Sequence, residues 1–195
     1  KYDIVQVTVN KDYLPGTVAI GDKDEFDYGN VSIEFSVENP TTVEIIIKME
    51  DNETVLNITT DERILNPDLA AGTYTITITN VGNDTVIPSN ASKTFTVNKL
   101  TPKISVVATD VTYPGDLIVN VTSDVTGSYA VKVGNQQVEI DLVATIIKNV
   151  IFAGLSANEY TIIVSYNETE NYTGAVNDTV KVSVSKASPT IAVSA

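Results

Sequence analysis

Acidic side chains gather in one loop near the start of the chain, and carboxylate oxygens are ligands that a calcium ion prefers. The loop reads Gly21-Asp-Lys-Asp-Glu-Phe-Asp-Tyr-Gly-Asn30, and its carboxylates are those of Asp22, Asp24, Glu25 and Asp27. The glycines permit a tight turn, but the full spacing of an EF-hand loop and its distal Glu are missing. A calcium site and a solvated acidic turn are both open interpretations, and the sequence predicts no other cofactor.

Asparagines in the pattern Asn-x-Ser/Thr form a second group of residues with a defined chemistry, N-glycosylation. The chain has 17 Asn, and 38 of its 195 residues are Ser or Thr, so chance predicts about three such sequons. The excess indicates exposure to N-glycosylation, and therefore a location outside the cell, at the cell surface. The nine sequons begin at Asn30, Asn52, Asn57, Asn83, Asn90, Asn120, Asn167, Asn171 and Asn177.

Three tyrosines near predicted loops are candidates for contact with a ligand. Tyr13, Tyr28 and Tyr172 lie among polar residues, and sugar-binding sites stack such rings against sugar faces, often at the loop tips of a sandwich. The alternative for Tyr172 is that its ring folds back and holds its own loop. A Lys–Asn isopeptide bond is a further possibility, although no motif marks a pair.

Composition excludes several classes of function. The chain has no Cys and no His, so disulfides, Cys- or His-type zinc sites and His general bases are absent. Its net charge of −13 disfavours nucleic acid, because binding phosphates requires Lys and Arg, and no apolar run is long enough for membrane insertion. The acidic residues are scattered over predicted turns and outer faces, so we expect no catalytic site and no enzyme.

Alternating apolar residues predict strands along most of the chain. The predicted strands cover 4–9, 31–37, 43–49, 55–59, 63–65, 93–97, 104–108, 117–121, 129–133, 138–140 and 179–184. The segment 10–27 has no clear alternation, and 167–178 is expected to be a long loop. The apolar run 142–152 is predicted as a strand, with a short helix as the alternative.

Two further strands follow a tyrosine that is preceded by a Leu and by small or polar residues. They occur in Leu69–Asn80, with Tyr74, and in Leu155–Tyr166, with Tyr160. An immunoglobulin-like sandwich has this pattern at its E–F corner, where the Tyr hydroxyl bonds back to the upstream backbone. The predicted fold class is therefore all-β, with two tandem immunoglobulin-like β-sandwiches and structural tyrosine corners at Tyr74 and Tyr160.

Repeat distances set the domain boundaries. Leu69 and Leu155 are 86 residues apart, and Lys99 and Lys186 are 87 apart. We predict one sandwich over 1–99 with an inserted 10–27 segment, a second over 100–186, and the first strand of a truncated third repeat over 187–195. That tail would be an exposed pairing edge, and we expect it to pair with a neighbouring molecule or to lie along the second unit.

The motifs of the second unit resemble a known group of repeats. They are Tyr113-Pro-Gly-Asp116, Val133-Gly-Asn135, Leu155-x-x-x-x-Tyr-Thr161, Tyr166-Asn-Glu-Thr-Glu-Asn-Tyr172 and Val184-Ser-Lys-Ala-Ser-Pro-Thr-Ile191. Together they are similar to the Ig-like repeats of methanogen adhesin-like proteins, large surface proteins of methane-producing archaea; related repeats occur in bacteria. Over 1–99 the match is looser, because that unit lacks Tyr-Pro-Gly-Asp. The resemblance implies adhesion or surface display and supplies no catalytic residues.

Three functions remain open. The first is a non-catalytic adhesin module that acts as a stalk or spacer and contributes to attachment. The second is direct binding of a glycan or protein on another cell's surface, through the 10–28 segment. The third is a pair of accessory domains of a surface enzyme that acts on polysaccharide.

Overall fold

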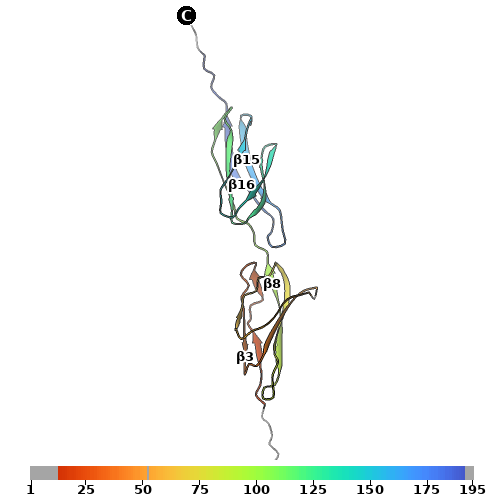
Figure 1. The fold of residues 1–195 in the computed structure, drawn as a ribbon. Coiled ribbons are helices and arrows are strands. Elements are labelled where there is room, and N and C mark those ends of the chain that lie inside the picture. Colours follow the sequence, from red (N-terminus) through yellow and green to blue (C-terminus); the bar gives the residue numbers. More distant parts are fainter. Residues whose placement is uncertain (1–12, 52, 192–195) are drawn as a thin grey trace, which may run out of the picture. The chain divides into compact units, whose positions relative to one another are not determined.

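The structure is a computed structural model that describes residues 13–51 and 53–191 (Figure 1). The chain divides into two compact units, unit 1 (Lys1–Lys99) and unit 2 (Leu100–Ala195). All regular elements of the described residues are β-strands. The strand predicted at 4–9 lies outside these residues.

Unit 1 is built from a three-stranded sheet, in the order β1-β3-β6, and a five-stranded sheet, in the order β2-β8-β7-β4-β5. Its strands are β1 (Val18–Ile20), β2 (Glu25–Asp27), β3 (Ile33–Val37), β4 (Val43–Met49), β5 (Thr54–Thr59), β6 (Ile64–Leu65), β7 (Gly72–Asn80) and β8 (Ser89–Asn98).

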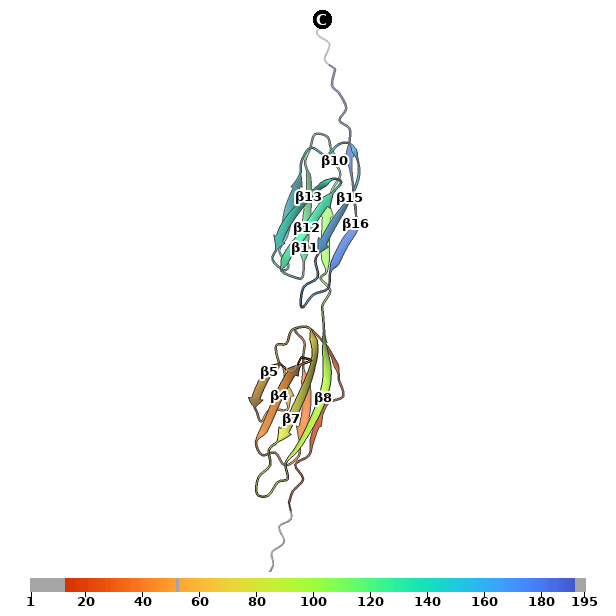
Figure 2. The same cartoon turned by 90° about the vertical axis from the view of Figure 1, so that its right-hand side faces the viewer.

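Unit 2 repeats this plan strand for strand, with sheets in the orders β14-β11-β9 and β10-β16-β15-β12-β13. Its strands are β9 (Ile104–Ala108), β10 (Val111–Thr112), β11 (Leu117–Ser123), β12 (Gly127–Val133), β13 (Gln136–Leu142), β14 (Lys148–Phe152), β15 (Asn158–Tyr166) and β16 (Ala175–Ser185). Figure 2 shows the strands of each five-stranded sheet side by side. The prediction of two immunoglobulin-like sandwiches is confirmed.

In each unit, apolar residues at every second position of the strands form the core, because successive side chains of a strand point to opposite faces. In β3 the alternation is strict, with Ile33, Phe35 and Val37 buried and Glu34 and Ser36 exposed. Branched aliphatic side chains fill both cores. Ile76 and Ile162, two residues after the corner tyrosines, are 1% and 0% exposed, so aliphatic packing occupies the place where antibody domains have a Cys.

The described part of the segment 10–27, residues 13–27, belongs to the sandwich and is not an insertion, so this prediction is corrected. It supplies β1, which pairs antiparallel with β3 as β9 does with β11, and β2, which pairs parallel with β8 as β10 does with β16. Both strands have only three residues, too few to produce a recognisable alternation. The Tyr28-Gly-Asn turn of unit 1 then stands where unit 2 has Tyr113-Pro-Gly-Asp.

The run 142–152 is not one strand, because the chain must cross from one sheet to the other within it. β13 ends at Leu142 and β14 begins at Lys148. Between them Thr145 adopts a φ of 66° and its N–H donates to the Ser123 carbonyl at 2.7 Å. The apolar side chains of Val143, Ile146 and Ile147 that suggested a strand are exposed there.

Two smaller boundaries also differ from the sequence prediction. The expected loop 167–178 ends earlier, since β16 already begins at Ala175 and pairs there with Tyr166 of β15. In the tail, residues 187–191 form no strand and Ile191 is exposed. The remaining part of the predicted 187–195 strand lies outside the described residues.

Candidate functional site

In each unit the second strand in chain order runs parallel to the last strand and is hydrogen-bonded to it. In unit 1, Phe26 of β2 lies opposite Val97 of β8, and the Tyr28 N–H donates to the Asn98 carbonyl at 3.0 Å. In unit 2, Val111 of β10 lies opposite Val184 of β16. Here the Tyr113 N–H donates to the Ser185 carbonyl at 2.9 Å. We call these two pairs the terminal clamps.

Different kinds of side-chain contact stabilise the two terminal clamps. In unit 1 the contact is apolar: Phe26 is buried, and its ring meets that of Phe95 edge-on at 5.7 Å. In unit 2 it is polar. Asp110 Oδ1 accepts from the Ser183 N–H at 2.7 Å, and the Thr112 and Ser185 hydroxyls lie 3.1 Å apart.

Very little chain separates the clamp of unit 1 from the first residue of unit 2 that is hydrogen-bonded within its own unit. Asn98 ends β8, and Leu100 forms a parallel bridge with Tyr172. The Leu100 N–H donates to the Asn171 carbonyl at 3.1 Å, and the Thr173 N–H donates to the Leu100 carbonyl at 2.9 Å. Only Lys99 lies between the two anchored residues.

The two predicted corner tyrosines bond back to the main chain in the same way. The Tyr74 hydroxyl donates to the Ala70 carbonyl at 2.9 Å, and the Tyr160 hydroxyl donates to the Ser156 carbonyl at 2.9 Å. The acceptor is four residues upstream in both cases, as a tyrosine corner requires. The corners therefore join the E–F connection to the five-stranded sheet in each unit.

The two corner tyrosines differ in how deeply they are buried. Tyr74 is 1% exposed and stacks on Phe95, with ring centroids 5.6 Å apart. Tyr160 is half-buried, and its ring lies against Gly134, where an added Cβ would come within 3.0 Å of Tyr160 Cε1. The corner tyrosine is thus buried in unit 1 and partly exposed to solvent in unit 2.

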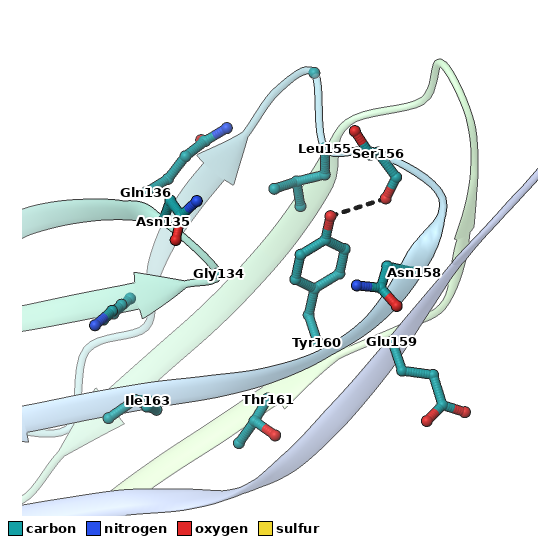
Figure 3. A pocket seen from close by; sticks show the side chains of 12 residues that line it. Gly134, Asn135, Gln136, Leu155, Ser156, Asn158, Glu159, Tyr160, Thr161 and Ile163 are labelled. Atoms are coloured by element: carbon teal, nitrogen blue, oxygen red, sulfur yellow. Dashed lines mark hydrogen bonds between the residues drawn. The ribbon is translucent and has the colours of Figure 1, made fainter.

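An open depression surrounds Tyr160 in unit 2 (Figure 3). Its volume is about 620 Å³, and most of its lining residues carry hydrogen-bonding side chains. Gln136 is held in place by a 3.0 Å bond from its Nε2 to the Ala153 carbonyl. The lining includes Lys132, Gly134, Asn135, Gln136, Asn158, Glu159, Tyr160 and Thr161. An aromatic face among donors and acceptors suits a polar, polyhydroxylated ligand.

A third tyrosine, which the sequence analysis did not single out, is buried in unit 2. Tyr129 is 0% exposed, its hydroxyl donates to the Val125 carbonyl at 2.8 Å, and Ser123 Oγ lies 2.8 Å away. Burial is the largest cause of its raised pKa, and the Ser123 hydrogen bond lowers that pKa in part. The signal in the sequence is a Tyr at the first inward position of a strand, after Gly127.

The acidic loop does not assemble a ready calcium site. Asp22 and Asp24 precede β2, whereas Glu25 and Asp27 lie on β2, on either side of the buried Phe26. Among residues 13–51 and 53–191, no three acidic side chains lie close enough to hold a metal ion. Calcium binding by these four residues stays a prediction.

The three candidate ligand-binding tyrosines have different surroundings. Tyr13 is 55% exposed. Tyr28 packs against the core of unit 1, and Tyr172 packs against the core of unit 2, with its ring 6.4 Å from that of Tyr166. Tyr172 therefore folds back on its own unit, which was the alternative interpretation. Ligand contact by the three stays a prediction.

Most sequons in the described residues are accessible. Asn30, Asn57, Asn83, Asn90 and Asn167 are exposed, whereas Asn120, Asn171 and Asn177 are half-buried; Asn52 lies outside the described residues. At two of them the sequon forms a local turn, because Thr85 donates its hydroxyl to Asn83 Oδ1 and Thr179 donates its hydroxyl to Asn177 Oδ1, both at 2.9 Å. Glycosylation itself stays a prediction.

Comparison with known proteins adds little beyond the fold. No family model matches the sequence, and a search of curated proteins found no match. The part of the chain that the structure describes contains no helix long and apolar enough to cross a membrane.

Three of the solved structures that resemble the chain consist of modules or domains in series. The fibronectin(III)-like modules of Clostridium thermocellum CbhA share 14% identity and a TM-score of 0.36, covering 87% of this chain and 95% of that one. The FN1-FN3 domains of chicken CNTN1 share 13% identity and a TM-score of 0.33, over 91% of this chain and 68% of that one. The three N-terminal domains of the bacteriophage RB49 highly immunogenic outer capsid protein share 13% identity and a TM-score of 0.31, over 88% of this chain and 70% of that one. Likenesses at this level carry no functional argument.

Proposed function

We propose that this chain is a non-catalytic, load-bearing spacer of a cell-surface adhesin, in keeping with the resemblance of its motifs to methanogen adhesin-like repeats. The observation that carries the proposal is the terminal clamp of each unit. A spacer that joins a cell to a distant attachment point must keep its modules folded while its two ends are pulled apart.

The terminal clamps have the right geometry for this task. In a parallel pair, the N-terminal end of one strand and the C-terminal end of the other point in opposite directions. β1 and β9 precede the clamp strands and pair with β3 and β11. Once tension on the two ends of a unit reaches its clamp, it pulls the two clamp strands past each other, so their hydrogen bonds are loaded together instead of one at a time. Resistance to forced unfolding is governed by the unfolding rate, which such a shared load keeps low.

The short connection between the units supports the same function. With only Lys99 between the bonded residues Asn98 and Leu100, tension passes from one clamp to the next element with almost no slack. A net charge of −13 keeps neighbouring copies apart at a crowded surface.

Single-molecule force spectroscopy on the full chain tests the spacer function. We expect two unfolding events, and the double variant Asp110→Ala/Ser185→Ala should lower the force of one of them. It removes side-chain hydrogen bonds of the unit 2 clamp, worth about 1 kcal/mol each, and leaves its backbone pairing intact.

The matched control is Gln137→Ala/Glu139→Ala, which removes a 2.9 Å side-chain bond on β13, an edge strand connected to neither end of the unit. This variant should leave both forces unchanged. Equal forces in the clamp variant and the wild type would refute the load-bearing role of the clamp.

A second candidate function is direct binding of a surface saccharide in the depression around Tyr160. The half-buried ring among hydrogen-bonding side chains favours it. NMR titration of the labelled full chain with a panel of oligosaccharides should shift the amide signals of β12, β13 and β15. Gln136→Ala should weaken such binding and Gln137→Ala should not; a panel without any shift would exclude this second function.

A further inference from the structure

The outward face of the three-stranded sheet of unit 2 exposes aliphatic side chains. Ile118 of β11 lies opposite Ile151 of β14, and they are 50% and 60% exposed. Val107 of β9 and Ile147, just before β14, are 59% and 63% exposed. We call these four residues the apolar face.

The described residues of unit 1 form no such face on the equivalent sheet, where the exposed Ile64 of β6 lies opposite Glu34. The registers of β1 with β3 and of β9 with β11 correspond at a spacing of 86 residues, as in the pairs Ile20–Phe35 and Val106–Val121. At this spacing Gly21 and Ser32 stand in the places of Val107 and Ile118, and Glu34 stands in the place of Asn120. The apolar face is therefore a property of unit 2 and not of the fold.

Asn120 lies in the middle of the apolar face and is the asparagine of a sequon. It pairs with Val107 on one side and with Asn149 on the other. With Val107 and Ile147 it lines a hollow of about 350 Å³, and its Oδ1 is buried without a hydrogen-bond partner. The sequon and the aliphatic side chains occur together in unit 2 and are both missing at the equivalent places of unit 1.

The apolar face also carries no charge. The strand residues on this side are Ser105, Val107, Ile118, Asn120, Thr122, Asn149 and Ile151, all aliphatic, hydroxyl or amide, in a chain with 25 acidic residues. The exposed Lys148 of β14 pairs with the buried Val121 and belongs to the other side of the sheet. Exposed apolar patches bind other molecules unless something covers them. A saccharide on Asn120 offers hydroxyl donors and acceptors together with the apolar faces of its rings, so it matches both kinds of group present here.

We propose that an N-linked glycan on Asn120 lies over the apolar face and shields it. Attachment forms a bond between Asn120 Nδ2 and the anomeric carbon of a saccharide. It breaks the bond from that carbon to the phosphate of a lipid-linked donor, and the leaving phosphate and one amide proton are released. This inference rests on the surface location in the proposed function, and it is independent of the terminal clamps.

The test compares the full chain secreted from a glycosylating eukaryotic host with the same chain made in a bacterial cytoplasm. Peptide mass mapping should find Asn120 occupied. The bacterial product should bind the apolar dye ANS at least about threefold more strongly than the secreted protein. Ile118→Ser, which copies unit 1, should remove most of that excess.

Sequon variants in the secreted protein isolate the glycan on Asn120. Thr122→Ala removes the sequon and should raise ANS binding to the bacterial level, whereas Thr122→Ser keeps the sequon and should not. Asn57→Gln, on β5 of unit 1, is the matched control and should have no effect.

Three results would overturn the proposal: a bare Asn120, ANS binding that does not respond to Thr122→Ala, or glycosylated protein that self-associates through the apolar face. Occupied sequons elsewhere with a bare Asn120 would defeat this inference and leave the surface location standing. A force measurement that fails to support the clamps would leave this inference untouched.

Discussion

Asn80 is a fully buried polar residue that ties the end of β7 to the connection between β3 and β4. Its Oδ1 accepts from the Thr41 N–H at 2.9 Å and from the Thr41 hydroxyl at 2.7 Å, and its Nδ2 donates to the Asn39 carbonyl at 3.2 Å. The equivalent place in unit 2 is held by Tyr166, whose ring packs 4.9 Å from that of Tyr129. One end of the core is thus closed by hydrogen bonds in unit 1 and by aromatic packing in unit 2.

Asn80→Ala should destabilise unit 1 by about 2–4 kcal/mol, because it leaves buried donors and acceptors without partners. Thr41→Ala should cost less, and the double variant should show a coupling of about 1–2 kcal/mol. Urea unfolding of the full chain, followed by hydrogen exchange in peptides of each unit, measures both. The exposed Asn90→Ala is the control, and a loss for Asn80→Ala no larger than the control's would contradict the role of Asn80.

Tyr129 gives unit 2 a dependence on alkaline pH. Because burial raises the pKa of its phenol in the folded state, folding favours the protonated form. Its contribution to stability is complete below the unfolded pKa of about 10 and is lost as pH rises through the higher folded pKa. We expect the unfolding free energy of unit 2 to fall above about pH 10, and Tyr129→Phe to flatten this fall. An unchanged pH profile in Tyr129→Phe would assign the effect to another group.

At the scale of elements, a test on β2 decides whether the segment 10–27 is an integral part of the sandwich or an insertion. Phe26 is 3% exposed and lies in the core of unit 1, so Phe26→Ala should destabilise that unit by about 3–5 kcal/mol. Tyr13→Ala, at an exposed side chain of the same segment, should change stability by less than about 1 kcal/mol. Thermal unfolding of the full chain measures both variants. A small effect of Phe26→Ala would restore the interpretation of 10–27 as an insertion.

The longer strands were predictable because their alternation is unbroken. β4 and β9 begin and end at the residues that the sequence predicts, Val43–Met49 and Ile104–Ala108. The tyrosine corners were predictable as well, because a Leu, a short polar stretch and a Tyr before a β-branched run form a local pattern. Each of these features lies within a few neighbouring residues.

The remaining features depend on residues that are distant in the sequence. β2 and β10 have three and two residues, which is too short for a recognisable alternation. They form strands because they pair with the last strand of their unit, which is about 70 residues away in the chain. Gly134 lines the depression and contacts the ring of Tyr160, which is 26 residues away in the chain, and no local pattern shows this contact. The turn at Thr145 is likewise imposed by the need to change sheets, which overrides the apolar run around it.

At the scale of the whole molecule, charge repulsion is one general term that opposes folding. The chain has 25 acidic and 12 basic residues, and surplus charge of one sign destabilises a compact state. Salt screens exposed charges, with a Debye length of about 10 Å at 0.1 M. The effect of salt screening on stability must therefore be separated from any specific binding of cations by the acidic loop.

Raising sodium chloride from about 10 to 200 mM should raise the unfolding temperature of the full chain by several degrees, because screening weakens the repulsion. Calcium chloride at matched ionic strength then decides the calcium hypothesis. If calcium chloride shifts the unfolding temperature only as much as sodium chloride does, screening alone explains the shift and the calcium hypothesis is refuted. A larger shift that disappears in Glu25→Gln/Asp27→Asn, but persists in Glu139→Gln/Asp141→Asn on β13, would establish a site at the acidic loop. An unfolding temperature that stays constant or falls with sodium chloride would show instead that repulsion does not limit the stability of this chain.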